Sequence, residues 1–134
     1  ISDKKLKPIK IVRTMPYPGF PTDAQAPVMA MTCLAKGTSV FVENIFESRY
    51  KHVGELLRMG AKIKVDSRVA VVEGIEMFSG ASVKADDLRG GASLIVAGLA
   101  AEGFTEISKV NYIDRGYENI ETTLNSIGAN IKRI

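Results

Sequence analysis

Cysteine and histidine are almost absent from this chain of 134 residues, which contains one of each. A single cysteine excludes a disulfide scaffold and any zinc site built on cysteines, and a single histidine excludes paired-histidine metal motifs. Long hydrophobic runs are also missing, because the longest, residues 92–101, is interrupted by Ser93 and Gly98 and is too short to span a bilayer. The sequence therefore predicts a soluble cytoplasmic protein with no metal, no cofactor and no membrane partner.

The composition is that of a folded domain, with 46% hydrophobic and 25% charged residues. The formal net charge of +3 is local, because residues 1–13 hold five of the 18 basic residues, Lys4, Lys5, Lys7, Lys10 and Arg13, against a single acidic one, Asp3. The rest of the chain is close to neutral, so we expect no nucleic-acid-binding face. Nucleotide-binding glycine loops, metalloprotease motifs and nucleophile elbows are absent as well.

The first half of the sequence predicts alternating strands and helices. A strand near residues 9–11 precedes a proline-rich turn and then a helix, which Thr22 or Asp23 can cap and which Gly37 ends. The further elements expected in this half are a strand, a helix and the two strands of a hairpin, at residues 40–45, 50–59, 61–65 and 69–72. This order is βαβαββ.

The second half repeats the first at a fixed offset. Gly103 lies 66 residues after Gly37 in matching Ala-x-Gly contexts, and Arg115 lies 66 residues after Arg49. The repeat predicts an α/β (α+β) fold with one βαβαββ unit in residues 1–79 and another in residues 80–134. We expect the helices of the two units to pack together in one body, and the alternating run 130–134 to form a strand.

Two residues with reactive side chains have ordinary structural interpretations. Cys33 lies on the apolar side of the first helix, which indicates core packing rather than a nucleophile. His52 is expected at the surface or at an interface rather than as a base.

Charged residues at equivalent places of the two units are the candidates for chemistry. Asp23 starts the first long helix, where it can act as a cap or accept a proton from a substrate hydroxyl. Asp87 opens the second long helix, whose N-terminal amides and Arg89 suit an anion. Arg49 and Arg115 occupy equivalent loops, so the pattern predicts one concave anion-binding face.

The same segments carry a resemblance to a known family. Residues 17–26, 44–50, 52–56, 58–61, 87–89 and 113–118 resemble the C-terminal portion of the UDP-N-acetylglucosamine 1-carboxyvinyltransferases, a family of enolpyruvyl transferases. The match stays in register from about residue 8 to residue 134. Departures are few: Ser48 stands where the family has Asn, Tyr50 where it has Phe, and Gly90 where it has Ala.

The resemblance implies an inside-out α/β barrel of two domains, each with three βαβαββ copies, of which this chain would supply two. The implied reaction transfers the enolpyruvyl group of phosphoenolpyruvate to the 3′-hydroxyl of UDP-N-acetylglucosamine, the first committed step of peptidoglycan synthesis. No metal or cofactor is implied. The family's reactive-loop cysteine and N-terminal lysine lie outside this sequence, and Cys33 does not match that cysteine, so we expect the chain to be inactive without the N-terminal domain of the same enzyme.

The resemblance also implies roles for individual residues. Asp23 would contact the sugar hydroxyl as the base, Ile45 would offer its backbone to the sugar nucleotide, and Phe46 would line the pocket. Arg89 and Arg115 would bind the phosphate and carboxylate of phosphoenolpyruvate. Arg49 would join that cluster, and Asp87 would orient the tetrahedral intermediate.

Two alternatives remain open at this point. The first is a fragment of 5-enolpyruvylshikimate-3-phosphate synthase, which shares the architecture and phosphoenolpyruvate. The second is a non-enzymatic RNA-binding or interaction module of βαβαββ type, against which the near-neutral body of the chain argues.

Overall fold

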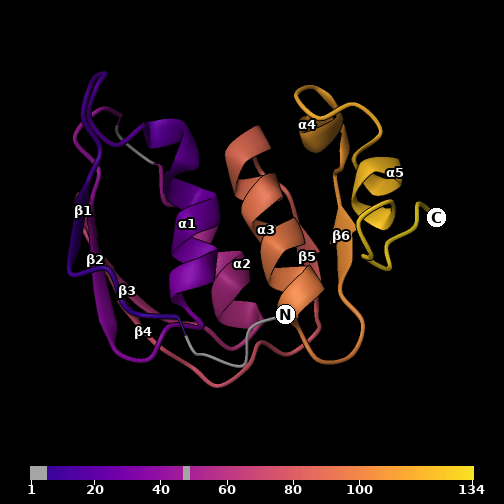
Figure 1. Cartoon of the computed structure of the whole chain (residues 1–134), viewed down its shortest axis with the longest axis horizontal. Helices are drawn as coiled ribbons and strands as arrows, with labels where there is room; N and C mark the ends of the chain where they lie inside the picture. Colours follow the sequence, from indigo (N-terminus) through magenta and orange to yellow (C-terminus); the bar gives the residue numbers. More distant parts are fainter. Residues whose placement is uncertain (1–5, 47–48) are drawn as a thin grey trace.

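A four-stranded sheet forms one side of the molecule (Figure 1). The structure, a computed structural model, describes residues 6–46 and 49–134. The strands, given in their spatial order, are β1 (Ile11–Arg13), β2 (Thr38–Val42), β4 (Val69–Glu73) and β3 (Lys62–Asp66). Strand β1 is parallel to β2, whereas β4 is antiparallel to both of its neighbours. The hairpin β3–β4 turns at Ser67 with φ of 56°, as predicted for residues 66–68.

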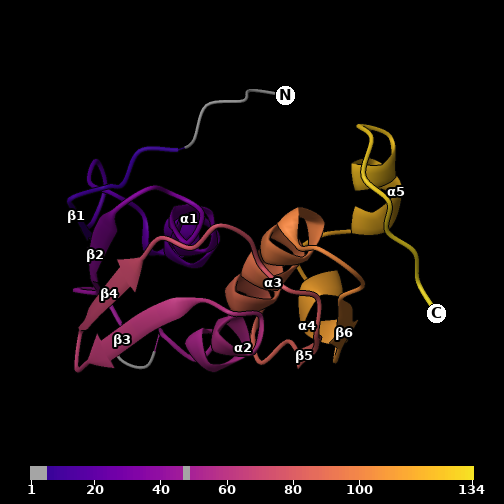
Figure 2. The ribbon, with the colours of Figure 1, turned by 90° about the horizontal axis from the view of Figure 1, so that it is seen from below.

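Helices cover one face of this sheet (Figure 2). They are the short 3-10 helix η1 (Thr22–Ala24), α1 (Gln25–Thr32) and α2 (Val53–Arg58). The order of elements up to residue 73 is therefore the βαβαββ predicted for the first unit. Lys4 and Lys5 of the basic lead-in, and Glu47 and Ser48 of the loop before α2, lie outside the described residues.

The second half begins with the same order of elements. Strands β5 (Ser82–Lys84) and β6 (Glu106–Ser108) form a parallel pair, and α3 (Leu88–Ala100) connects them. Helices α4 (Asn111–Asp114) and α5 (Ile120–Asn125) follow. Within the described ranges, no helix is both long enough and apolar enough to cross a membrane.

The strand expected at residues 130–134 is wrong, because the chain after α5 forms no ladder with a neighbouring strand. Side chains hold this tail instead. The amide group of Asn125 donates to the Ile131 carbonyl at 2.7 Å and accepts from its N–H at 3.0 Å. Arg133 donates to both Asp114 and Glu121, and these bonds lower the pKa of both carboxyls.

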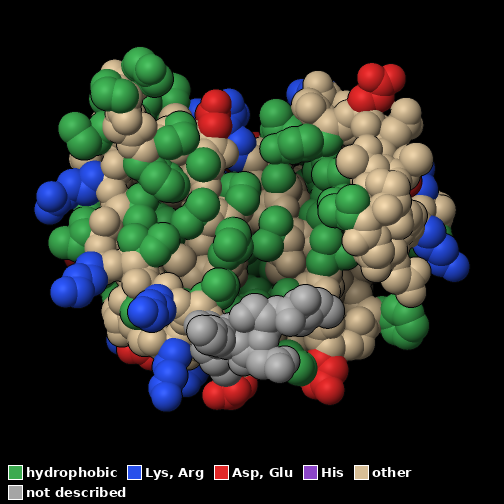
Figure 3. Space-filling view, viewed as in Figure 1, with side chains coloured by type: hydrophobic (Ala, Val, Ile, Leu, Met, Phe, Trp, Pro, Cys, Tyr) green, Lys and Arg blue, Asp and Glu red, His purple; other side chains and the backbone are tan. Residues whose placement is uncertain are grey.

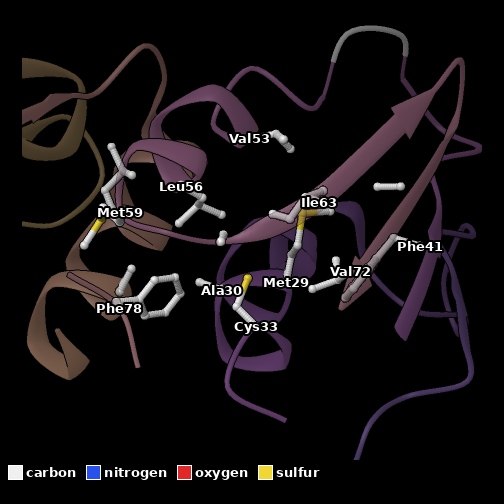
Figure 4. Packing of buried hydrophobic residues seen from close by; sticks show 14 of the residues in the cluster. Met29, Ala30, Cys33, Phe41, Val53, Leu56, Met59, Ile63, Val72 and Phe78 are labelled. Atoms are coloured by element: carbon white, nitrogen blue, oxygen red, sulfur yellow. The ribbon is translucent and has the colours of Figure 1, made fainter. Parts of the chain in front are cut away.

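The core lies between the helices and the four-stranded sheet. At the edge of this core, α1 packs against α3. Side chains from α1, α2 and the sheet point into one space in Figure 4. The largest fully buried apolar side chains are Phe41, Phe78, Met29, Leu56, Met59 and Leu94. Cys33 is buried among them as predicted, and burial raises the pKa of its thiol to about 12. A thiol with this pKa stays protonated near neutral pH, which agrees with a packing role.

Apolar side chains also gather on the outer face of the molecule where α1 and α3 lie (Figure 3). Met31 on α1 is 47% exposed and Leu99 on α3 is 45% exposed. Val28 and Val96 on the same helices are partly exposed. The two helices therefore present apolar surface that the described residues leave uncovered.

Two glycines hold the junction between the halves in close contact with neighbouring backbone. Gly74 donates its N–H to the Gly37 carbonyl at 2.8 Å, and Gly80 donates to Glu102 at 2.8 Å. A Cβ added at Gly74 would lie 1.7 Å from the carbonyl oxygen of Ala35, and one at Gly80 would lie 2.2 Å from that of Phe104. The junction has room for glycine alone at both positions.

His52 is 4% exposed, so its predicted surface position is wrong. The residue precedes α2 and packs against α3, with its Cβ 3.1 Å from the place where a Cβ of Gly90 would lie. Its Nε2 has no hydrogen-bond partner in the part of the chain that the structure describes. Burial lowers the pKa of His52 to about 4, although the nearby Asp87 charge acts in the opposite direction.

The glycine contacts predict a contrast between two substitutions. Gly74→Ala should lower the free energy of unfolding by about 1–3 kcal/mol or more, because the new methyl group must displace backbone. Gly54→Ala, on α2, should raise it by about 0.5–1 kcal/mol, because nothing lies within 4 Å of the added Cβ and alanine favours the helix. Urea denaturation of both variants measures the difference, and equal effects would contradict the close contact.

The buried histidine predicts a pH dependence of stability. The unfolded chain binds a proton near the ordinary histidine pKa of about 6.5, whereas folded His52 does so only near 4. The free energy of unfolding should therefore fall as the pH drops from about 6.5 toward 4, by at most about 1.4 kcal/mol per pH unit. The neutral variant His52→Asn should be nearly flat from pH 6.5 to 5. Because the chain has one histidine, NMR titration of its ring reads the pKa directly, and a value near 6.5 would refute the burial.

Candidate functional site

Every candidate residue from the sequence follows the carboxyl end of one of four parallel-paired strands. They are Asp23 after β1, Ile45, Phe46 and Arg49 after β2, Asp87 and Arg89 after β5, and Arg115 after β6. Parallel pairing puts the ends of β1 and β2 at one edge, and those of β5 and β6 at another. Figure 1 shows both pairs of strand ends at the same, upper end of the molecule, together with α4 and the starts of α1 and α3. Ligands of open α/β sheets bind at this end of parallel strands.

An ion pair joins the two halves at this end. The Nε of Arg89 donates to Oδ1 of Asp23 at 2.5 Å, across 66 residues of sequence. The side chain of Arg89 is 35% exposed and that of Asp23 is 66% exposed, so both remain open to a ligand. The structure thus brings together two of the predicted site residues, one from each half.

The predicted cap of the first helix by Thr22 or Asp23 is wrong. No side chain caps η1 or α1, whose N-cap residues are Pro21 and Ala24. The Asp23 carboxylate is engaged by Arg89, and the Thr22 hydroxyl donates to Glu43 at 2.8 Å. Both side chains have stronger, charged partners than the backbone amides of the helix.

Arg49 and Arg115 each lie over an aromatic ring three residues earlier in the chain. The Arg49 guanidinium is 4.2 Å from the centre of the Phe46 ring, and that of Arg115 is 5.3 Å from the centre of the Tyr112 ring. A cation–π contact uses the flat face of the guanidinium and leaves its N–H groups at the edge. The stacking therefore orients these two arginines while keeping donors for an anion.

Asp87 caps α3, with its Oδ1 accepting from the Gly90 N–H at 2.5 Å. A Cβ at Gly90 would lie 2.6 Å from this oxygen and 3.1 Å from the Cβ of His52. Glycine at position 90 therefore permits the cap as it stands. The cap leaves Oδ2 of Asp87 for other partners.

Glu43 is the functional-site residue that the sequence reasoning missed. It follows β2 and is 2% exposed. Burial raises the pKa of its carboxyl, but hydrogen bonds from Thr14, Thr22 and the backbone of Ile45 and Phe46 outweigh it, and the net pKa lies below the ordinary value. Ser39 and Phe41 of β2 are buried, and the same alternation continued one step past the strand puts position 43 on the buried side. The signal in the sequence was a carboxylate at that position.

Among residues 6–46 and 49–134, no three or more His, Cys, Asp or Glu side chains are grouped so that they could hold a metal ion. The chemistry of the described site rests on one ion pair, two stacked arginines and two carboxylates with hydrogen-bonded surroundings.

The Asp23–Arg89 pair predicts a measurable coupling. A double-mutant cycle with Asp23→Asn and Arg89→Gln should give a coupling free energy of about 0.2–1 kcal/mol, because the pair is exposed to solvent. The coupling should decrease as salt increases from low to molar concentration. A control cycle of Asp23 with Lys62, on β3, should give none. Equal coupling in both cycles would contradict a specific pair.

Comparison with known proteins places this chain in a family. The sequence model of the EPSP synthase (3-phosphoshikimate 1-carboxyvinyltransferase) family matches residues 2–124. The structure is similar to the enolpyruvyl transferase NikO from Streptomyces tendae, with a TM-score of 0.82 and 29% identity over 94% of this chain and 30% of that one. It also resembles an EPSP synthase from Acinetobacter baumannii, with a TM-score of 0.67 and 19% identity over 84% of this chain and 27% of that one. At 19% identity, the similarity to the EPSP synthase structure shows a shared fold alone.

Curated relatives are more similar in sequence. A UDP-N-acetylglucosamine 1-carboxyvinyltransferase from Desulfofundulus thermocisternus is 61% identical over 96% of this chain and 52% of its own length. Another from Desulfovibrio desulfuricans is 57% identical over 91% of this chain and 29% of its own length. The chain therefore spans between about three tenths and half of these relatives. With a family match over nearly its whole length and the same fold as solved enolpyruvyl transferases, the chain belongs to the EPSP synthase (3-phosphoshikimate 1-carboxyvinyltransferase) family.

Proposed function

We propose that this chain is the C-terminal part of an enzyme that transfers the enolpyruvyl group of phosphoenolpyruvate to the 3′-hydroxyl of UDP-N-acetylglucosamine. The reaction would serve peptidoglycan synthesis in the cytoplasm. Curated relatives that bear the name of this activity are 53–61% identical to the chain. The observation that carries the proposal is the Asp23–Arg89 pair, which joins a carboxylate and a guanidinium at the strand ends where the other candidate residues also lie.

Asp23 is the proposed general base. Its carboxylate is open to solvent and follows a loop with three prolines, Pro16, Pro18 and Pro21, which limit the backbone freedom before it. In the reaction the 3′-oxygen of the sugar forms a bond to C2 of phosphoenolpyruvate and gives up its proton, while the C2–C3 double bond opens and C3 gains a proton. The bond between C2 and the phosphate oxygen then breaks and C3 loses a proton, which releases phosphate and restores the enol double bond. A carboxylate within reach of the hydroxyl accelerates such a proton transfer by about 10²–10⁴-fold.

The arginines are the proposed anion-binding groups. Phosphoenolpyruvate carries a phosphate and a carboxylate, and a guanidinium can meet either with two parallel N–H donors. Arg89 and Arg115 would take these roles, with Arg49 as a third donor. Orientation of Arg49 and Arg115 by ring stacking lowers the cost of ordering them when the anion binds.

The remaining roles are assigned to the neighbouring residues. Ile45 would offer its backbone to the sugar nucleotide, and Phe46 would line the pocket beneath it. Asp87 would orient the tetrahedral intermediate through Oδ2, the oxygen that the cap leaves over.

Further copies of the unit, and the N-terminal domain, would complete the enzyme. The exposed apolar face of α1 and α3 supports this part of the proposal, because the same helices would be covered in a larger body. We expect the chain on its own not to release phosphate from the two substrates, because one wall of the cleft would be missing.

The complete enzyme tests the proposal. With phosphoenolpyruvate and UDP-N-acetylglucosamine it should release phosphate, and with shikimate 3-phosphate in place of the sugar nucleotide it should not. Asp23→Asn should lower kcat by about 10²–10⁴-fold, because the base is lost. Arg115→Ala should raise KM for phosphoenolpyruvate by about tenfold or more, since a charged hydrogen-bond partner is removed.

Matched controls lie at the opposite end of the strands and helices. Glu106→Gln, at the start of β6, should leave kcat unchanged, and Arg58→Ala, at the end of α2, should leave KM unchanged. Turnover of shikimate 3-phosphate but not of the sugar nucleotide would overturn the assignment of substrate.

A further inference from the structure

The buried carboxylate of Glu43 connects the two loops that carry the proposed sugar-nucleotide contacts. Its Oε1 accepts hydrogen bonds from the Thr22 hydroxyl at 2.8 Å and from the Gln25 side chain at 3.5 Å. Both donors belong to the segment that follows β1, one on each side of Asp23. The other oxygen, Oε2, accepts from the Thr14 hydroxyl at 2.7 Å.

The same Oε2 also holds the loop after β2. It accepts from the backbone N–H groups of Ile45 at 3.0 Å and Phe46 at 3.2 Å. Both bonds are partly buried. A backbone N–H group that folding removes from water needs an acceptor, and leaving it unpaired costs up to about 1–3 kcal/mol. Glu43 is the acceptor for both, so the conformation of the loop at Ile45 and Phe46 depends on this side chain.

Thr14 strengthens the connection between the loops. Its hydroxyl accepts from the Asn44 N–H at 2.8 Å, so its own hydrogen is free to point at Glu43. Thr14, which directly follows β1, thus connects the Asn44 N–H of the loop after β2 to the Glu43 carboxylate. The Glu43 carboxylate is buried and accepts five hydrogen bonds, and a buried polar group with this many partners favours one arrangement of the groups around it.

The second half of the site does not take part in this network. Arg89 and Arg115, the proposed ligands of phosphoenolpyruvate, follow β5 and β6, whereas the described hydrogen-bond partners of the Glu43 carboxylate lie between residues 14 and 46. Arg89 is connected to them through its ion pair with Asp23. Loss of Glu43 should therefore act on one side of the site more than on the other.

We propose that Glu43 is a positioning residue that sets the Asp23 carboxylate and the Ile45 backbone at a defined separation for the sugar nucleotide. This inference rests on the proposed function, in which Asp23 and Ile45 contact that substrate. It assigns Glu43 no contact with either substrate. Its effect passes through the two loops that it joins.

Steady-state kinetics of the complete enzyme test the inference. Glu43→Ala should raise KM for UDP-N-acetylglucosamine at least tenfold and lower kcat, while KM for phosphoenolpyruvate stays within about twofold. Glu43→Gln should recover most of the loss, because the amide keeps the shape and one acceptor oxygen for the two backbone N–H groups. Thr22→Val, which removes one of the bonds that reach Glu43 from the segment after β1 and keeps those to Ile45 and Phe46, should lower kcat with little change in either KM.

The control is Glu55→Ala, which removes another buried carboxylate, on α2 and outside the network. It should leave both KM values unchanged, which separates positioning from a general loss of stability. Equal changes of the two KM values in Glu43→Ala, or the same pattern in Glu55→Ala, would overturn the inference. If Glu43→Ala does not fold, a Thr22→Val variant with wild-type kcat would overturn it as well.

Hydrogen exchange distinguishes failure of this inference from failure of the proposed function. Glu43→Ala should speed exchange of the Ile45 and Phe46 amides at least tenfold, and Glu55→Ala should not. A wild-type enzyme that does not turn over the sugar nucleotide refutes the function, whereas unchanged exchange of these two amides refutes the positioning role in either case.

Discussion

The packing of α1 against α3 is the contact on which the arrangement of the site depends. Each helix follows a strand of a different sheet, and no strand ladder joins the sheets among the described residues. Ala30 on one helix and Ala97 on the other are fully buried in the same hydrophobic cluster. Because the helices lie side by side, the strand ends of both sheets open toward the same end of the molecule. The contact between the helices therefore brings the ends of the β1–β2 pair and of the β5–β6 pair to one surface.

Much of the fold could be predicted from the sequence because local patterns and the internal repeat agree. Alternating polar and apolar residues mark β3, and a run of four apolar residues marks β4. Glycines with positive φ, Gly37 and Gly60, stand where the first two helices were expected to end. The 66-residue offset further predicted that Asp23 and Arg89 would occupy equivalent positions. The two residues meet because Asp23 lies just before α1, Arg89 lies in the first turn of α3, and these two helices pack against each other.

The parts that could not be predicted depend on contacts between distant segments. The residues next to His52 in the sequence do not show that its side chain is buried. It is buried because α3, which begins 36 residues further along the chain, packs against it. The cap of the first helix failed for the same reason, because distant charged groups compete for Thr22 and Asp23. The tail after α5 has a strand pattern, yet a strand needs a partner edge, and the described residues offer none there. The assigned roles of the candidate site residues stay predictions.

The two halves of the chain differ in charge where the Asp23–Arg89 ion pair joins them. Asp23 and Arg89 carry opposite charges at this contact. A like charge at both positions would make the two halves repel each other there. A variant in which one of the two residues changes the sign of its charge would therefore lose the attraction, and a matching change in its partner would restore it.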